Sequence, residues 1–234
     1  MDRREFNCAT VAALGVLAII APGEGRALGL ADLSNAEAGQ GVTTALEQGA
    51  VAAVGVLGKP DGFLNNPQVR IPLPGFLSDA AKLLKAIGQG KRVEELEVAM
   101  NRAAEAAVPL AKDLLIKAVK TMTLKDAKNI LTGGPTSVTT FFVERTRSPL
   151  AVQFLPVVTA ATKQVGLAEK YNRVASKVAG TGLVNKEDAT IEQYVTRKSL
   201  DGLYFMIGEE EKKIRQDPVG SGKAILSKVF GAVK

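Results

Sequence analysis

The side chains that could do chemistry in this chain are carboxylates and arginines, because it has no histidine and its one cysteine is Cys8. Without histidine there is no Ser-His-Asp or Cys-His machinery and no histidine-ligated zinc. A hydrolase would therefore need two carboxylates roughly 5 to 10 Å apart on a cleft, one as acid and one as base. The candidates are Glu105, Asp126 and Asp201. We expect no cofactor and no metal ion.

Asp201 lies at the apolar end of a segment, 198–216, that is predicted to be helical. An aspartate buried there needs a cationic partner, and Arg197 and Lys198 are close in the sequence. This placement favours a structural ion pair over catalysis. Asp201 nevertheless remains a candidate contact for a ligand or partner.

Three consecutive glutamates, Glu209–Glu211, raise the possibility of a metal site. Adjacent residues of a helix point about 100° apart, so the three carboxylates cannot converge on one ion. A solvated helix face is the better interpretation, with Glu209 and Lys213 as an i,i+4 pair.

Phosphate-binding motifs are incomplete. The run Gly220–Lys223 is similar to the end of a P-loop, but Asp217 stands where the first glycine is required, and Ala224 stands where the hydroxyl residue is required. The net charge of +6 is spread over segments that mix lysine and arginine with glutamate, as in 91–95. The sequence therefore indicates neither a nucleotide site nor a nucleic-acid partner.

The stretch from Gly58 to Gly75 holds four prolines and cannot be a regular helix. Its apolar side chains are untypical of a solvated linker, so we expect an ordered loop pinned onto the helices. If this segment is extended, the Arg70 side chain points to the side opposite those of both neighbouring residues. We favour an interaction of Arg70 with a carboxylate or with the C-terminal end of a helix, and a contact with an anion or ligand is the alternative. We take Arg70, Phe63 and Asn65 as candidate ligand or partner contacts.

Residues 1–27 have the three parts of an export signal: the basic pair Arg3-Arg4, an apolar run from Cys8 to Pro22, and a small-residue end at Ala27. The apolar run is shorter than the roughly 20 residues that span a bilayer, so it indicates a cleaved signal rather than an anchor. The arginine pair resembles the twin-arginine motif, although ordinary Sec export stays open. We expect a periplasmic protein with no transmembrane segment in its mature chain.

The elements that must position these side chains are helices. Apolar residues recur at helical spacing and no β-branched alternation is found, so we predict an all-α, single-domain bundle over 28–234 with about eight or nine helices. Ser34 and Glu37 form a capping box, and Pro109 predicts a kink. The expected ranges are 35–57, 78–88, a helix from 91 broken near 109, 123–133, a helix from 135, 149–165, 167–178, 190–216 in one or two pieces, and 223–230.

Several runs resemble the bacterial domain of unknown function family 4197. They are Leu57–Pro60, Gly62–Asn65, Val69–Pro74, Met100–Glu105, Met122–Ala127, Tyr194–Thr196, Leu200–Leu203 and Glu209–Arg215. The run Phe141–Thr146 departs from the usual pattern of the family, which has a basic residue where Val143 stands. The resemblance covers about 28–230 and implies an exported helical protein of Gram-negative bacteria. It implies no activity, cofactor or catalytic residue.

Two functions remain open. The first is a non-enzymatic periplasmic binding or interaction module for an apolar ligand or an envelope partner, with the loop 58–75 as the lip of a groove. The second is a carboxylate-dependent hydrolase acting on an envelope polymer. The hydrolase fails if its three candidate carboxylates are scattered or paired with lysine and arginine.

Overall fold

The computed structural model describes residues 34–178 and 188–231, so the expected leader lies outside the described residues. Across these two ranges the chain forms helices and no strand, which confirms the all-α class. The helices are α1 (Asn35–Leu57), α2 (Gly75–Ala86), α3 (Gly90–Ala107), the 3-10 turn η2 (Val108–Leu110), α4 (Ala111–Lys120), α5 (Leu124–Thr132), α6 (Ser137–Thr162), α7 (Gly166–Val178), α8 (Ile191–Gln216) and α9 (Ala224–Gly231).

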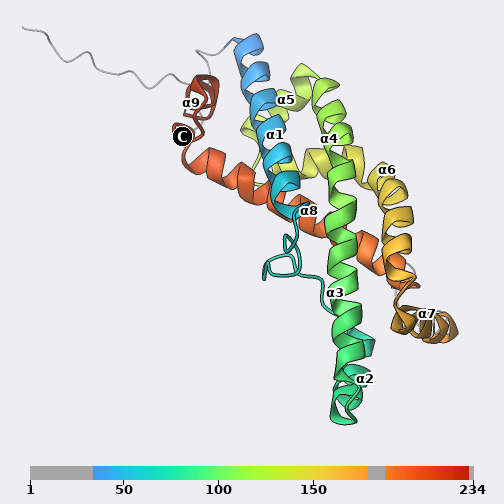
Figure 1. The fold of residues 1–234 in the computed structure, drawn as a ribbon. Coiled ribbons are helices and arrows are strands. Elements are labelled where there is room, and N and C mark those ends of the chain that lie inside the picture. Colours follow the sequence, from blue (N-terminus) through green and yellow to red (C-terminus); the bar gives the residue numbers. More distant parts are fainter. Residues whose placement is uncertain (1–33, 179–187, 232–234) are drawn as a thin grey trace, which may run out of the picture.

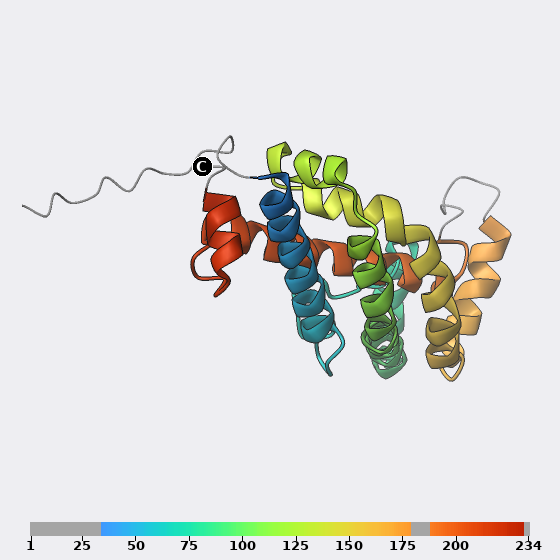
Figure 2. The same ribbon diagram turned by 90° about the horizontal axis from the view of Figure 1, so that it is seen from above.

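Helix α8 packs against α1, α3, α6, α7 and α9. It crosses behind α1, α3 and α6 in Figure 1, and the view from above in Figure 2 shows the same crossing. Helix α9 lies beside α1 at one end of the molecule, and α7 lies at the other end. The buried apolar side chains of these helices form one continuous core. Leu200, Leu203 and Ile207 of α8 are in it, as their apolar surroundings in the sequence predict, whereas Phe205 is partly exposed.

The N-terminal end of α1 carries the predicted capping box. The Ser34 hydroxyl accepts from the Glu37 amide, and the Glu37 carboxylate accepts from the Ser34 amide. Lys228 of α9 also donates to Glu37, and these hydrogen bonds lower the pKa of Glu37 to about 2. Further along α1, a Cβ added at Gly41 would lie 2.5 Å from Val229 of α9. The glycine therefore allows α9 to approach α1 closely.

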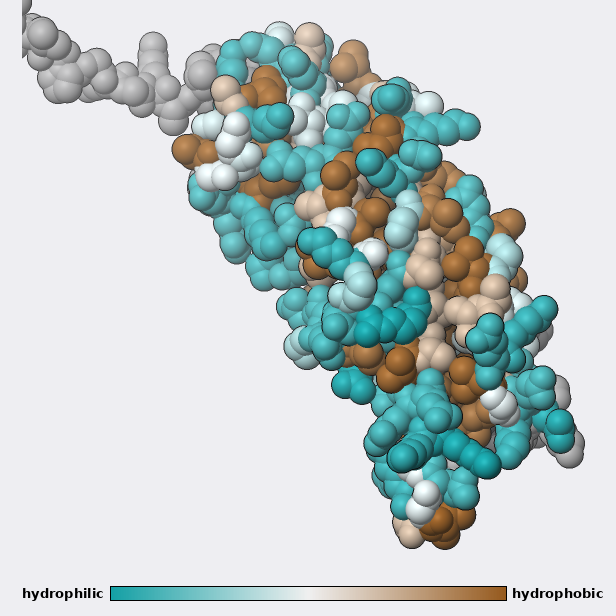
Figure 3. Space-filling view, viewed as in Figure 1, coloured by the Kyte–Doolittle hydropathy of each residue, from teal (hydrophilic) through white to brown (hydrophobic). Residues whose placement is uncertain are grey.

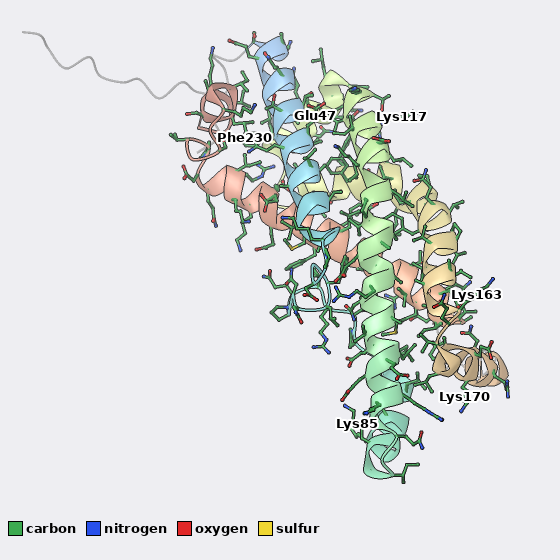
Figure 4. The ribbon with its side chains drawn as sticks, in the orientation of Figure 1. Glu47, Lys85, Lys117, Lys163, Lys170 and Phe230 are labelled. Carbon is green, nitrogen blue, oxygen red and sulfur yellow. The ribbon has the colours of Figure 1, made fainter. Side chains whose placement is uncertain are left out.

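Helix α9 is fixed by its aromatic end. Figure 4 places Phe230 between α9 and α1, and its side chain is buried. The guanidinium carbon of Arg215 lies 5.5 Å from the centre of the Phe230 ring. The labelled lysines Lys85, Lys163 and Lys170 project from the opposite end of the molecule, where α2, α6 and α7 end or turn (Figure 4).

Proline positions divide the helices differently from expectation. Pro109 lies in η2, which joins α3 to α4 without a loop, so the predicted break near 109 is confirmed. By contrast, Pro149 and Pro156 both lie inside α6, which is one helix where two were expected. Packing of α6 against α3, α4 and α8 outweighs the backbone hydrogen bonds that the two prolines remove.

One further boundary corrects the sequence interpretation, and one alternative that the sequence left open is decided. Helix α2 begins at Gly75, directly after Pro74, rather than at the expected cap near residue 78. Segment 191–216 is the single helix α8, with the Thr190 hydroxyl accepting from the Gln193 amide at its start. Because α8 is a single helix, it holds Arg197 and Asp201 in a fixed position relative to each other.

Candidate functional site

Helices α6 and α8 enclose an open groove of about 400 Å³. We call it the arginine groove, and it is lined by Arg147, Ser148, Ala151, Val152, Leu155, Gln193, Thr196, Arg197 and Leu200. Its volume falls within the roughly 300–1,000 Å³ that ligand sites in proteins occupy. Val152 is 75% exposed and Leu155 is 38% exposed. Apolar side chains thus remain open to solvent along this groove.

The spacing of the lining residues explains how two helices make the groove. They recur at alternating intervals of one and three residues, on α6 between Arg147 and Leu155 and on α8 between Gln193 and Leu200. Residues with this spacing share one face of a helix. Each helix therefore contributes one stripe, and the groove runs where the two stripes face each other.

A second cavity of about 600 Å³ continues along the same pair of helices toward the start of α6. We call it the Phe205 cavity, and it is lined by Pro135, Thr136, Thr139, Val143, Arg147, Asp201, Tyr204, Phe205, Gly208, Glu209 and Lys212. Arg147 lines both spaces. Its side chain, paired with Asp201, therefore stands at the boundary between the arginine groove and the Phe205 cavity.

Two arginines converge on Asp201. Arg147 of α6 donates to one carboxylate oxygen, and Arg197 of α8 donates to the other at 3.3 Å. Arg197 also donates from Nε and Nη2 to the two oxygens of Asp188, each at 2.8 Å. The hydrogen bond to Asp188 raises the pKa of Arg197 above its ordinary value. Arg197 is thus clamped by a bidentate pair, whereas Arg147 depends on Asp201 alone among carboxylates of the described residues.

Tyrosine rings flank these arginines. The guanidinium carbon of Arg147 lies 5.8 Å from the centre of the Tyr204 ring, and that of Arg197 lies 5.6 Å from the Tyr194 ring. Burial raises the pKa of each tyrosine to about 12, so both rings carry neutral hydroxyls at physiological pH. The Tyr204 hydroxyl pairs with Thr146 at 2.8 Å, and the Tyr194 hydroxyl donates to the Pro72 carbonyl at 2.9 Å.

One polar group of the arginine groove lacks a partner. The Thr196 hydroxyl is buried, and no donor or acceptor of the described residues pairs with it. The side chain as a whole is 5% exposed. A buried hydroxyl without a hydrogen bond costs about 1–3 kcal/mol, so its presence calls for an explanation.

The loop between α1 and α2 is ordered by three side chains of α3, as the expectation of a pinned loop requires. Asn101, fully buried, accepts from the Ile71 amide at 2.8 Å and donates to the Ile71 carbonyl at 3.0 Å. Glu105 accepts from the amides of Phe63 and Leu64 at 3.0 and 3.1 Å. Arg102 joins Glu105 to Asp61 at the loop start. The loop is therefore held in one conformation from end to end.

The candidate contacts in the loop are placed as follows. Phe63 is fully buried, and a Cβ added at Gly202 of α8 would lie 2.7 Å from its ring. Asn65 is exposed, and Arg70, also exposed, pairs with Glu97 at 3.4 Å. The loop contributes no lining residue to the arginine groove or the Phe205 cavity. Phe63 therefore seals the core, and the loop does not form the lip of either space.

The candidate catalytic carboxylates are each held by arginine. Asp201 pairs with Arg147 and Arg197, Glu105 pairs with Arg102, and Asp126 caps α5 and pairs with Arg145 at 3.0 Å. Hydrogen bonds from the Thr123 amide, the largest cause, lower the pKa of Asp126. This is the arrangement under which the hydrolase hypothesis fails. In the described ranges, no group of three or more potential ligands from His, Cys, Asp and Glu could hold a metal ion.

The glutamate run on α8 also differs from the sequence interpretation. Glu211 is buried and accepts from the amides of Val138 and Thr139 at the start of α6, and Arg215 pairs with it at 2.9 Å. Lys213 pairs with Glu210, at 2.6 Å, in place of the expected Glu209. The prediction of a solvated face is therefore wrong for Glu211, which caps α6 from another helix.

Sequence reasoning found Arg197 as a partner of Asp201 because the two are four residues apart on one helix. It missed Arg147, which lies 54 residues away on α6. No local pattern marks Arg147, since it lies in the polar run Glu144–Ser148, which matches no motif. It also missed Thr196, because burial of a single hydroxyl leaves no signal in sequence.

A family model described as Protein of unknown function (DUF4197) matches residues 32–231 of the chain. No curated protein and no solved structure matches the chain. No single helix in the described ranges is long and apolar enough to cross a bilayer. One pair of helices passes that test together, Ser137–Thr162 with Gly166–Arg173, and it is bent by 118°.

Proposed function

We propose that this chain, which belongs to the family described as Protein of unknown function (DUF4197), is a non-enzymatic module that binds an apolar ligand. The observation that carries this proposal is the arginine groove. Its walls are made by Ala151, Val152, Leu155 and Leu200, and two of these apolar side chains stay exposed. Exposed apolar surface in a concave site is typical of a binding surface, because burying it releases water.

Within residues 34–178 and 188–231, the candidate carboxylates do not support catalysis. The carboxylates that a hydrolase would need are engaged by arginines or by backbone amides. A carboxylate whose oxygens are engaged in this way is not placed to exchange a proton with a substrate. A module that binds a ligand without reacting with it is consistent with both the exposed apolar groove and the engaged carboxylates.

We further propose that the protein acts in the periplasm, with residues 1–27 as a cleaved leader of the twin-arginine type. The double substitution Arg3→Lys and Arg4→Lys should keep the precursor in the cytoplasm, whereas Sec export would tolerate the change. Cell fractionation with N-terminal sequencing of the mature chain measures both the route and the cleavage point. Normal export of the doubly substituted precursor would overturn the twin-arginine assignment.

The binding proposal is tested with an apolar fluorescent probe, N-phenylnaphthylamine, whose emission rises in an apolar site. Val152→Asp places a charge in the groove, yet Val152 is so exposed that the fold should be retained. Val51→Asp, on α1 and 44% exposed, is the matched control. We expect the wild type and Val51→Asp to bind the probe, and Val152→Asp to lose at least about tenfold in affinity.

Native mass spectrometry of the protein isolated from its own envelope gives an independent readout. We expect a co-purifying small apolar molecule that is absent from Val152→Asp. Equal probe binding by the two variants, or no probe binding at all, would overturn the proposed function. In the second case, cross-linking of an envelope protein to the groove would favour a protein partner instead.

A further inference from the structure

We propose that the ligand of the arginine groove is an amphiphile with a carboxylate head, and that this head replaces Asp201 on Arg147. The inference rests on the proposed function and specifies its ligand class. The apolar tail would lie along Val152 and Leu155, and the head would lie at the end of the groove where Arg147 stands.

The charge of the groove is the first argument. Among the described residues that line it, the charged ones are Arg147 and Arg197, and no carboxylate is present. Asp201 lines the Phe205 cavity on the other side of Arg147 instead. An apolar groove whose only lining charges are guanidinium groups is complementary to an anionic amphiphile. Arginine also matches the planar shape of a carboxylate through two parallel N–H donors.

The exposure of the ion pair is the second argument. The side chains of Arg147 and Asp201 are 36% and 38% exposed. Exposed pairs of this kind contribute little to stability, because water competes for both partners. The pair between Arg215 and Glu211 is far more buried, with side chains 16% and 2% exposed. A ligand carboxylate can therefore take over Arg147 at a small cost, whereas the buried pair cannot be exchanged in this way.

The two arginines have different tasks. Arg197 keeps Asp188 through a bidentate contact and can also hold Asp201 after the exchange. Arg147 engages Asp201 through Nη2 alone, so its other N–H groups have no carboxylate partner among the described residues. Arg147 is therefore the group that can turn from Asp201 to a ligand while Asp201 stays paired with Arg197.

The Thr196 hydroxyl is the third, independent argument. Thr196 lines the arginine groove, but its hydroxyl oxygen is buried behind that lining and has no partner in the described part of the chain. A rotation of the Thr196 side chain about χ1 would bring this hydroxyl into the groove, where a carboxylate oxygen would supply the acceptor that it lacks. The same head group would thus satisfy the unpaired polar group and the free donors of Arg147.

The test compares dansyl-undecanoic acid with its methyl ester, which keeps the tail but removes the charge. We expect the wild type to bind the acid more tightly than the ester. Arg147→Gln should weaken binding of the acid by about tenfold or more and leave the ester unchanged. Asp201→Asn should tighten binding of the acid by up to about fivefold, because the competitor for Arg147 is removed.

Arg145→Gln is the matched control, since Arg145 is on the same helix but pairs with Asp126 and does not line the groove. Added salt should weaken the wild-type protein's affinity for the acid and not for the ester, which tests the charge without any substitution. The ester also reports whether each variant is folded.

The outcomes separate the two claims. If the acid and the ester bind equally and neither Arg147→Gln nor Asp201→Asn distinguishes them, the carboxylate head is refuted while the apolar site stands. If Asp201→Asn weakens the acid and the ester alike, Asp201 is only structural and the exchange is refuted. If neither probe binds the wild type, the proposed function fails and the inference fails with it.

Discussion

The side chain of Asn101 holds the loop between α1 and α2 in its conformation, so removing this side chain tests how the loop is held. Its side chain pairs with both the amide and the carbonyl of Ile71, at 2.8 and 3.0 Å, and both residues are buried. Asn101→Ala leaves these two backbone groups without partners. At about 1–3 kcal/mol for each, we expect a loss of about 2–6 kcal/mol in the free energy of unfolding.

Such a loss is a large share of the roughly 5–15 kcal/mol that typically stabilises a domain. Urea denaturation followed by circular dichroism measures it, with an unchanged slope if the unfolded state is unaffected. The midpoint of thermal unfolding should fall by about 2–4 °C for each kcal/mol. Asn65→Ala, at an exposed position of the same loop, is the control and should stay within about 0.5 kcal/mol of the wild type. A loss below about 1 kcal/mol for Asn101→Ala would refute the account of the loop.

Three other perturbations follow from the same geometry. Gly202→Ala places a Cβ 2.7 Å from the Phe63 ring and should lower the free energy of unfolding by about 1–3 kcal/mol, measured by thermal or urea denaturation. Gly55→Ala, with open space around the added Cβ, should raise it by up to about 1 kcal/mol. Equal effects of the two substitutions would contradict the tight packing of the loop. Glu211→Ala removes a buried carboxylate from its arginine partner and should cost about 3–5 kcal/mol, and a neutral result would show that α6 does not need this cap. The pKa of Glu37 is lowered from 4.5 to about 2, so the contribution of Glu37 to stability should be complete above pH 4.5 and decrease as the pH falls toward 2. If the difference in unfolding free energy between the wild type and Glu37→Gln does not change over this pH range, the ionised Glu37 does not stabilise the fold.

Local features of the sequence predicted the parts of the fold that depend on neighbours within one turn. The capping box at Ser34 forms as expected, because its two partners, Ser34 and Glu37, lie three residues apart. The pairing of Arg197 with Asp201 was accessible for the same reason, since an interval of four residues brings side chains together on a helix.

Features that depend on tertiary packing were not accessible. Pro149 was expected to begin a separate helix over 149–165, yet α6 runs through it, because contacts with α3, α4 and α8 compensate the missing hydrogen bond. Glu211 was placed on a solvated face, although it caps α6 from another helix. The arginine groove itself depends on the register between α6 and α8, and sequence spacing on one helix does not determine that register.

Apolar side chains are exposed on the surface of the molecule, where they can contact a ligand or a partner. Figure 3 shows apolar side chains interspersed with hydrophilic ones over α1, α3, α4 and α6. Isolated apolar side chains of this kind are common on protein surfaces. The arginine groove differs because its exposed apolar residues lie beside two guanidinium groups and a buried hydroxyl without a partner.

A crystal structure of the protein with a brominated fatty acid tests the central claim most directly. Anomalous scattering locates the bromine on the tail, and the density around Arg147 shows which carboxylate it holds. We expect the tail between α6 and α8 beside Val152, the head on Arg147 and Thr196, and Asp201 turned toward Arg197. A tail bound elsewhere, or Asp201 still on Arg147 with the ligand in place, would contradict the account.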